Sequence, residues 1–159
     1  MDATELDGAE LAGHVRVRSA AADDKREKAN FQIILTAPHG GHHLLPNIPP
    51  RKYGYLNPDD HTAALTDLLH VRLEMAMGRV RVVSVVGELH RKYCDLNRPR
   101  GPRSHESQAL DCYYDMYHQT IRNSINNNNE VDKSETPHFI PTLLIDVHGQ
   151  SYSPNSILY

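Results

Sequence analysis

Two histidines in this sequence each follow a hydrophobic run and could bind a metal ion. His39 lies in the block PHGG at 38–41, and His148 lies in the block DVHGQS at 146–151. Alternate residues of a strand point to the same face, so Asp146 could orient the His148 imidazole through a hydrogen bond. A single loop histidine is usually only bonded to backbone, and Asp146 could be a simple strand-end residue. Because a histidine follows a hydrophobic run in both blocks, we favour His39 and His148 as metal ligands.

A basic block between these histidines carries groups that bind carboxylates. It reads LHRKYCDLNR over residues 89–98. Arg98 has a planar guanidinium that can hold a carboxylate through two parallel hydrogen bonds, and Asn97 can add a neutral donor beside it. Arg91 could polarise a carbonyl and stabilise the oxyanion that develops on it. The alternative is a solvated strand end in which Asp95 pairs with Arg91 or Arg98 at the surface.

Strand patterns end at each of these blocks. Residues 14–19 alternate as in a half-exposed strand, and residues 31–37 are nearly continuously apolar, as in a strand buried on both faces. Residues 80–86 are β-branched and apolar, and residues 142–147 indicate a last buried strand. Ligand sites of open α/β sheets form at the carboxyl ends of strands, so the three blocks are expected to meet there.

Two helices are predicted between the strands. Apolar residues recur at helical spacing over 65–77, followed by Gly78 as a stop. Ser104 is predicted to cap a second helix. Its buried stripe is predicted to comprise Leu110, Tyr113, Tyr114, Tyr117, Ile121 and Ile125. Strands that alternate with helices predict an α/β fold with a mostly parallel sheet and helices packed on it.

Composition predicts one soluble globular domain. The chain has 159 residues, 39% of them hydrophobic and 23% charged, and a net charge of −3, which gives no reason to expect nucleic acid or membranes as partners. Two cysteines, no secretory prefix and no apolar run near the roughly 18 residues of a membrane span favour a cytoplasmic protein. We divide it into a polar segment 1–30 with a possible edge strand and a domain 31–159.

Four blocks, in this order, resemble the N-formylglutamate amidohydrolase family. Its members show Pro-His-x-Gly, Asp-x-x-Thr-x-x-Leu, a basic run ending in Asp-x-Asn-Arg, and Asp-x-His-Gly or Asp-x-His-Ser. This chain has them at 38–41, 59–65, 95–98 and 146–149, within a match from residue 31 to its end. The resemblance implies a three-layer α/β/α sandwich similar to zinc carboxypeptidases. It also implies one zinc ion and hydrolysis of the C–N amide bond of a small N-acyl amino acid that carries a carboxylate, such as N-formylglutamate.

The resemblance also suggests a third metal ligand, since catalytic zinc usually has three protein ligands and an open position. Asp59 of the second block is favoured. His42 is the alternative, because it lies three residues after His39, where zinc carboxypeptidases have a Glu. Asp59 could instead be an ordinary residue at a helix N-terminus. The resemblance agrees with Asn97 and Arg98 as a pair that anchors the substrate carboxylate.

One part of the family's machinery is missing from this sequence. Zinc carboxypeptidases carry a Glu, which acts as general base, on a strand after the last His ligand, and this chain has no Glu after His148. We therefore expect the C-terminal part of the fold to be missing. Two functions stay open: a zinc amidohydrolase, or a catalytically incomplete fragment or pseudoenzyme that binds metal and carboxylate without turnover. An uncovered strand around Ile145 could drive self-association through its edge.

Overall fold

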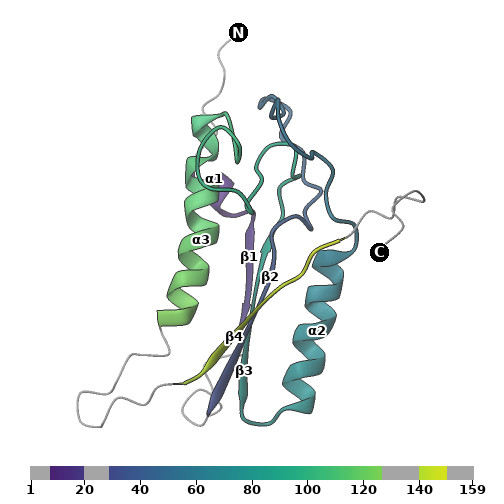
Figure 1. Ribbon diagram of the computed structural model, residues 1–159, viewed down its shortest axis with the longest axis vertical. Helices are drawn as coiled ribbons and strands as arrows, with labels where there is room; N and C mark the ends of the chain where they lie inside the picture. The colour runs from purple at the N-terminus through teal and green to yellow at the C-terminus, as the bar shows by residue number, and fades with distance from the viewer. Residues whose placement is uncertain (1–7, 20–28, 127–139, 150–159) are drawn as a thin grey trace, which may run out of the picture.

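The computed structural model of the chain is a mixed α/β structure with a four-stranded sheet at its centre (Figure 1). It describes residues 8–19, 29–126 and 140–149. The strands are β1 (Val15–Ser19), β2 (Phe31–Ala37), β3 (Val80–Gly87) and β4 (Thr142–Asp146). Their order across the sheet is β1-β3-β2-β4. β2 pairs in parallel with β3 and with β4, whereas β1 is antiparallel to β3, so the sheet is mixed.

The two central strands confirm the sequence prediction, and one edge strand does not. β2 and β3 are buried over most of their length, as their continuous apolar runs predict, and β1 is the half-exposed edge strand expected near residues 14–19. The prediction of a buried strand at 142–147 is wrong. β4 is the other edge strand, and its three apolar side chains are 37–49% exposed, because no described element packs against its outer edge.

Two long helices cover opposite faces of the sheet (Figure 1). Helix α3 (Asp111–Asn126) packs Tyr113 and Tyr117 against Ile34 of β2 in the main hydrophobic core. Helix α2 (Thr62–Ala76) packs Leu69 and Leu73 on the other face in a smaller cluster with Ile33, Leu35 and Val82. Neighbouring strand residues point to opposite faces, which explains why Ile33 and Ile34 belong to different clusters.

Helix α2 is oriented differently from what its apolar pattern suggests. It buries Thr62, Thr66 and His70, whereas Leu65 on the predicted apolar stripe is 47% exposed. An ion pair from Arg16 of β1 to Asp67 of the helix, 2.6 Å long, holds a polar side of α2 toward the β1 end of the sheet. Leu69 and Leu73 pack on the sheet, whereas Leu65, Leu68 and Met75 are exposed.

The N-terminal residues of the described part belong to the same core. Helix α1 (Gly8–Ala12) places Leu11 fully buried against α3, next to β1. A short 3₁₀ turn (Gln108–Leu110) precedes α3. Ser104 does not cap α3 as predicted, because its hydroxyl donates to the Gly101 carbonyl (2.9 Å) within an earlier turn. No helix of the described ranges is long and apolar enough to cross a membrane.

Candidate metal centre

Three residues from separate segments meet at the carboxyl ends of β2 and β4. His39 follows β2, Asp59 precedes α2, and His148 follows β4. One ligand atom from each lies within 4.8 Å of the other two. Nδ1 of His148 is 3.0 Å and Nδ1 of His39 is 3.5 Å from the same oxygen, Oδ2 of Asp59. Because β2 and β4 are parallel neighbours, the residues after them emerge at the same edge, and this group could hold a metal ion.

The environment of His39 fits a metal ligand. Its side chain is 1% exposed, and its Nδ1 is buried without a hydrogen-bond partner. A buried nitrogen without a partner is costly, and a metal ion held together with Asp59 would satisfy it. The loop after β2 packs so closely that a Cβ on Gly41 would lie 2.1 Å from the Glu88 carbonyl carbon, which encloses the histidine.

Each histidine is held through its second ring nitrogen by a carboxylate. Nε2 of His39 is 2.7 Å from Oδ1 of Asp95, and Nε2 of His148 is 2.8 Å from Oδ2 of Asp146. Thr36 of β2 donates its hydroxyl hydrogen to the other oxygen of Asp146 at 2.6 Å. Such carboxylates fix the ring orientation of metal-binding histidines. Asp146 therefore has the contact with His148 that the sequence predicts.

Asp95 is a site residue that the sequence reasoning missed. The alternative in which Asp95 pairs with Arg91 is confirmed as a contact, at 3.1 Å, but the pair is not at the surface, because Asp95 is 1% exposed. Besides His39, it accepts hydrogen bonds from the Arg91 guanidinium (3.1 and 3.2 Å) and from the backbone N–H of Asn97 (3.1 Å). Burial raises the pKa of Asp95, but the hydrogen bond and charge of His39 together with Arg91 hold it well below its usual range. The apolar neighbours in the run YCDL were the available signal of its burial.

Of the two candidates for the third ligand, Asp59 is the one that lies beside the histidines. Its carboxylate accepts hydrogen bonds from the Gly149 backbone N–H (3.1 Å) and from Arg91 (3.3 Å) and does not cap α2. Burial raises the pKa of Asp59, but hydrogen bonds from His148 and Gly149 outweigh it and lower the pKa. His42 is exposed, and its Nε2 is 3.8 Å from Asp60, outside the cluster.

His148 is tied to carboxylates through both ring nitrogens, at Asp59 and Asp146. Burial lowers the pKa of His148, but these two hydrogen bonds raise it above its usual value. Nδ1 of His148, the atom that lies closest to Asp59, is thus paired with a carboxylate in this structure. The rest of the last sequence block, Gln150 and Ser151, lies outside the described residues.

The predicted substrate-binding residues lie around this cluster. Nδ2 of Asn97 is 3.3 Å from Nε2 of His148. The Arg98 side chain is 57% exposed, with Nε 4.0 Å from Asp95. It borders a pocket of about 200 Å³ that is lined by Arg51, Tyr53, Gly54, Arg98 and Arg103. The guanidinium of Arg91 contacts both Asp59 and Asp95, so in this structure its donors are used by carboxylates.

Arg51 supports this pocket and could not be found from sequence. It is 3% exposed and donates to the backbone carbonyls of Tyr53, Tyr55, Arg91 and Arg103, at 2.9–3.2 Å. Burial lowers its pKa, against the opposing charge of Asp95. Because an arginine in a proline-rich loop is usually exposed, no sequence pattern indicates this role.

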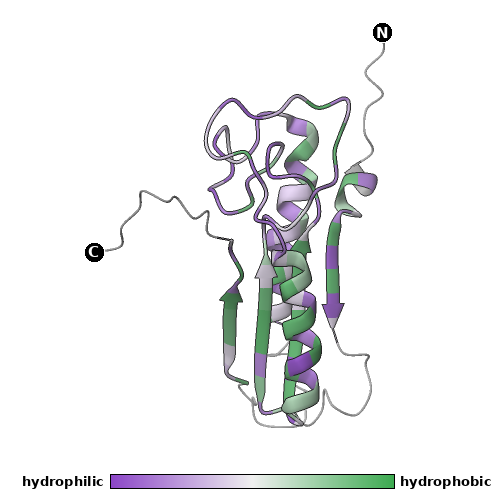
Figure 2. Cartoon of the chain, turned by 90° about the vertical axis from the view of Figure 1, so that its right-hand side faces the viewer, coloured by the Kyte–Doolittle hydropathy of each residue, from purple (hydrophilic) through white to green (hydrophobic). Residues whose placement is uncertain are grey.

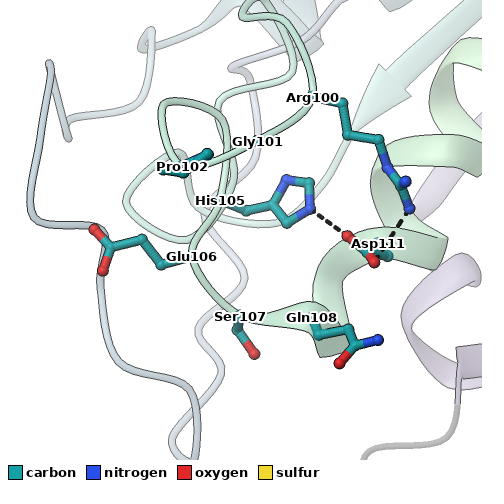
Figure 3. Close-up of a pocket in the computed structure, with 8 residues that line it drawn as sticks. All are labelled: Arg100, Gly101, Pro102, His105, Glu106, Ser107, Gln108 and Asp111. Atoms are coloured by element: carbon teal, nitrogen blue, oxygen red, sulfur yellow. Dashed lines mark hydrogen bonds and ion pairs between the residues drawn. The ribbon is translucent and has the colours of Figure 1, made fainter.

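A larger hollow of about 480 Å³ lies between residues 100–108 and the start of α3 (Figure 3). His105 and Arg100 both contact Asp111 there, at 2.7 and 3.1 Å. The Ser104 hydroxyl is 2.8 Å from the other nitrogen of His105, which gives a serine, histidine and aspartate in series. Ser104 is fully buried and cannot reach a substrate. The network therefore anchors the loop to α3.

No family model, curated protein or solved structure matches this chain. The resemblance to N-formylglutamate amidohydrolases consequently rests on the four sequence blocks. The cluster of His39, Asp59 and His148, which could hold a metal ion, is a separate observation, because it comes from the fold.

Proposed function

We propose that this chain is a zinc-dependent amidohydrolase-like protein that hydrolyses the C–N amide bond of a small N-acyl amino acid, similar to N-formylglutamate. The observation that carries the proposal is the cluster of His39, Asp59 and His148, which includes a buried imidazole nitrogen without a partner. Two histidines and one carboxylate are a ligand set of catalytic zinc in proteins, with one position left open. Bound zinc would supply polarisation of the amide carbonyl and activation of water.

The chain's own residues give the site its orientation. Asp95 and Asp146 fix the rings of His39 and His148, so that both Nδ1 atoms point toward Asp59. Arg91 joins the carboxylates of Asp59 and Asp95. Such a preorganised arrangement avoids reorganisation when substrate binds. Arg91 is the group that we propose to stabilise an oxyanion, which would require it to exchange one of these contacts for the substrate.

Arg98 and Asn97 are proposed to bind the substrate carboxylate. Arg98 is exposed beside a pocket that Arg51 and Arg103 also line, and Asn97 lies next to His148. Since these residues border the metal cluster, a small acid bound to them would have its amide near the cluster. The positive lining favours an anionic ligand, and the small pocket favours a short side chain.

A second candidate is a domain that binds metal and carboxylate without turnover. Among the described residues, every carboxylate that contacts the cluster is already engaged: Asp95 with His39, and Asp146 with His148. Glu88 is held by Arg16 at 2.7 Å. Amide hydrolysis needs a general base that later protonates the leaving amine, and none of these groups is free for that task.

The test is zinc content of the purified protein, measured together with hydrolysis of N-formylglutamate in the same preparation. Near-stoichiometric zinc with turnover that the His148→Ala variant loses is the result expected for the hydrolase. Stoichiometric zinc without turnover would favour the non-catalytic candidate. Folded protein that takes up no zinc would overturn both candidates, and turnover that survives in His148→Ala would be a contaminant's activity.

A further inference from the structure

The outer edge of β4 differs from the opposite edge of the sheet. β4 pairs with β2 and, in the described part of the chain, with nothing on its other side. Its only charged residue is Asp146 at the end, and its centre consists of Leu143, Leu144 and Ile145, all more than one-third exposed. β1 at the other edge carries Arg16 and Arg18. Charged side chains protect sheet edges from pairing, so β4 is the unprotected edge.

Apolar side chains of β4 extend over both faces of the sheet. In the register with β2, Leu143 lies beside Ile33 and Ile145 beside Leu35, whose side chains face α2. Leu144 lies beside Ile34, which faces α3. Helix α2 packs on β3 and β2, and Figure 2 shows β4 at the edge of the sheet, separated from this helix by β2 and without a helix over it. The apolar face of β4 is therefore continuous with the edge of the sheet.

Helix α2 adds apolar surface next to β4. Asp67 contacts Arg16 on β1, so the side of the helix that carries Asp67 faces the β1 end of the sheet. Leu65 is two residues away, which places it about 160° around the helix, on the flank toward β4. Leu65 is 47% exposed on this flank, whereas Leu68 and Met75 lie on the side of the helix away from the sheet. Exposed apolar area that extends over two elements marks an interaction surface.

We propose that β4 pairs antiparallel with β4 of a second copy of this chain, which joins the two sheets into one. The segment is self-complementary about a two-fold axis at Leu144. Leu144 then faces its own counterpart, Leu143 faces Ile145, and the charged Asp146 faces the uncharged end of the other strand. No like charges meet, whereas a heterologous partner would need its own apolar edge strand.

The same axis brings further apolar surface together. A two-fold axis perpendicular to the sheet keeps the α2 helices of both copies on the same side, where each Leu65 flank faces the other across Leu143 and Ile145. The side chains that meet at this interface are therefore the three apolar residues of β4, with Leu65 of α2 beside them.

The first test is the molar mass of the full chain in solution by light scattering after size exclusion, compared with Leu144→Lys. Wild type is expected to be a dimer and Leu144→Lys a monomer at the same concentration, because two lysines would face each other at the axis. Val17→Lys is the matched control, since Val17 is similarly exposed on the other edge strand and faces the α3 side, as Leu144 does. That variant should stay dimeric. A monomeric wild type, or a dimer that Leu144→Lys leaves intact, overturns the proposal.

A second test holds even where Leu144→Lys does not fold. In a Cys112→Ser background, Leu144→Cys should form an intermolecular disulfide on mild oxidation, because directly opposed strand residues lie within disulfide distance. The remaining native thiol, Cys94, is buried. Val17→Cys in the same background should stay uncrosslinked. Equal crosslinking of both variants, or none at Leu144→Cys, would contradict pairing at this axis.

Discussion

The two histidines differ in how much protein surrounds them, and Asp95 accounts for much of the difference. His39 is enclosed, and its Nε2 is bound to a carboxylate that is itself buried and held by Arg91. His148 is one-third exposed and relies on Asp146 at the end of an edge strand. We infer that His39 and Asp95 form the rigid half of the site and that His148 completes it.

Replacing Asp95 with Asn should therefore weaken zinc binding while all three proposed ligands remain. Loss of a carboxylate behind a metal-binding histidine usually costs about 10–100-fold in affinity, because the ring loses its fixed orientation and part of its basicity. Competition with a chromophoric chelator measures the dissociation constant. Asp60→Asn is the control, because Asp60 is 75% exposed and pairs with His42, which lies outside the cluster. An unchanged constant in Asp95→Asn would remove Asp95 from the site.

Arg98→Ala should separate binding of the substrate carboxylate from binding of the metal. The side chain is exposed and 4.0 Å from Asp95, so its removal should leave zinc affinity unchanged. A hydrogen bond to a charged group contributes about 1.5–3 kcal/mol, so binding of N-formylglutamate should weaken roughly 10–100-fold. Calorimetry on the zinc-loaded protein tests this, with Arg122→Ala on exposed α3 surface as control. Equal affinities in the two variants would exclude Arg98 from the carboxylate site.

At the scale of elements, the loop after β2 is positioned by its glycines through close packing. Neither Gly40 nor Gly41 has a left-handed backbone. Instead a Cβ on Gly40 would lie 2.7 Å from the Ala63 nitrogen, at the start of α2. The loop is thereby held between α2 and the end of β3, where the His43 N–H donates to the Glu88 carbonyl at 3.0 Å.

Gly41→Ala should consequently destabilise the fold and displace His39. Its Cβ would lie 2.1 Å from the Glu88 backbone, and such overpacking costs about 1–3 kcal/mol or more. Urea unfolding followed by circular dichroism measures the free energy of unfolding. Gly78→Ala is the matched control, because a Cβ there meets no atom within 4 Å. If both variants unfold at the same urea concentration, the close packing of this loop does not contribute to stability.

The strands and helices also show which features of the fold could be predicted from sequence patterns. Continuous apolar runs predicted β2 and β3, because a strand with apolar side chains on both faces is stable only when both faces are buried. The orientation of α2 was not predictable, since apolar residues lie on several sides of this helix. The exposure of β4 could not be predicted from its sequence either, because the strand would have the same apolar composition whether another segment or a second copy covers it.

For the whole molecule, a short strand pattern predicts that a strand exists and says nothing of its direction. β1 is antiparallel to β3, although the alternating strand and helix order suggested a mostly parallel sheet. The candidate metal ligands could be found from sequence because each follows a strand or precedes a helix that the sequence pattern predicts. Asp95 and Arg51 could not, because their contacts cross between loops: Asp95 with the segment after β2, and Arg51 with residues 91 and 103.

Since the ligands come from three segments, zinc should stabilise the whole fold. His39, Asp59 and His148 join the end of β2, the start of α2 and the edge strand β4. Ligand that binds only the folded state adds about 2.7 kcal/mol when its free concentration is about 100 times the Kd. For a domain of this size that corresponds to an increase in Tm of about 5–10 °C. Thermal unfolding with excess zinc and with EDTA should show this difference in Tm.

His148→Ala should abolish the zinc-dependent difference in Tm, whereas His42→Ala should keep it, because His42 lies outside the cluster. A zinc-dependent shift that survives in His148→Ala would mean that the metal stabilises the protein from another site.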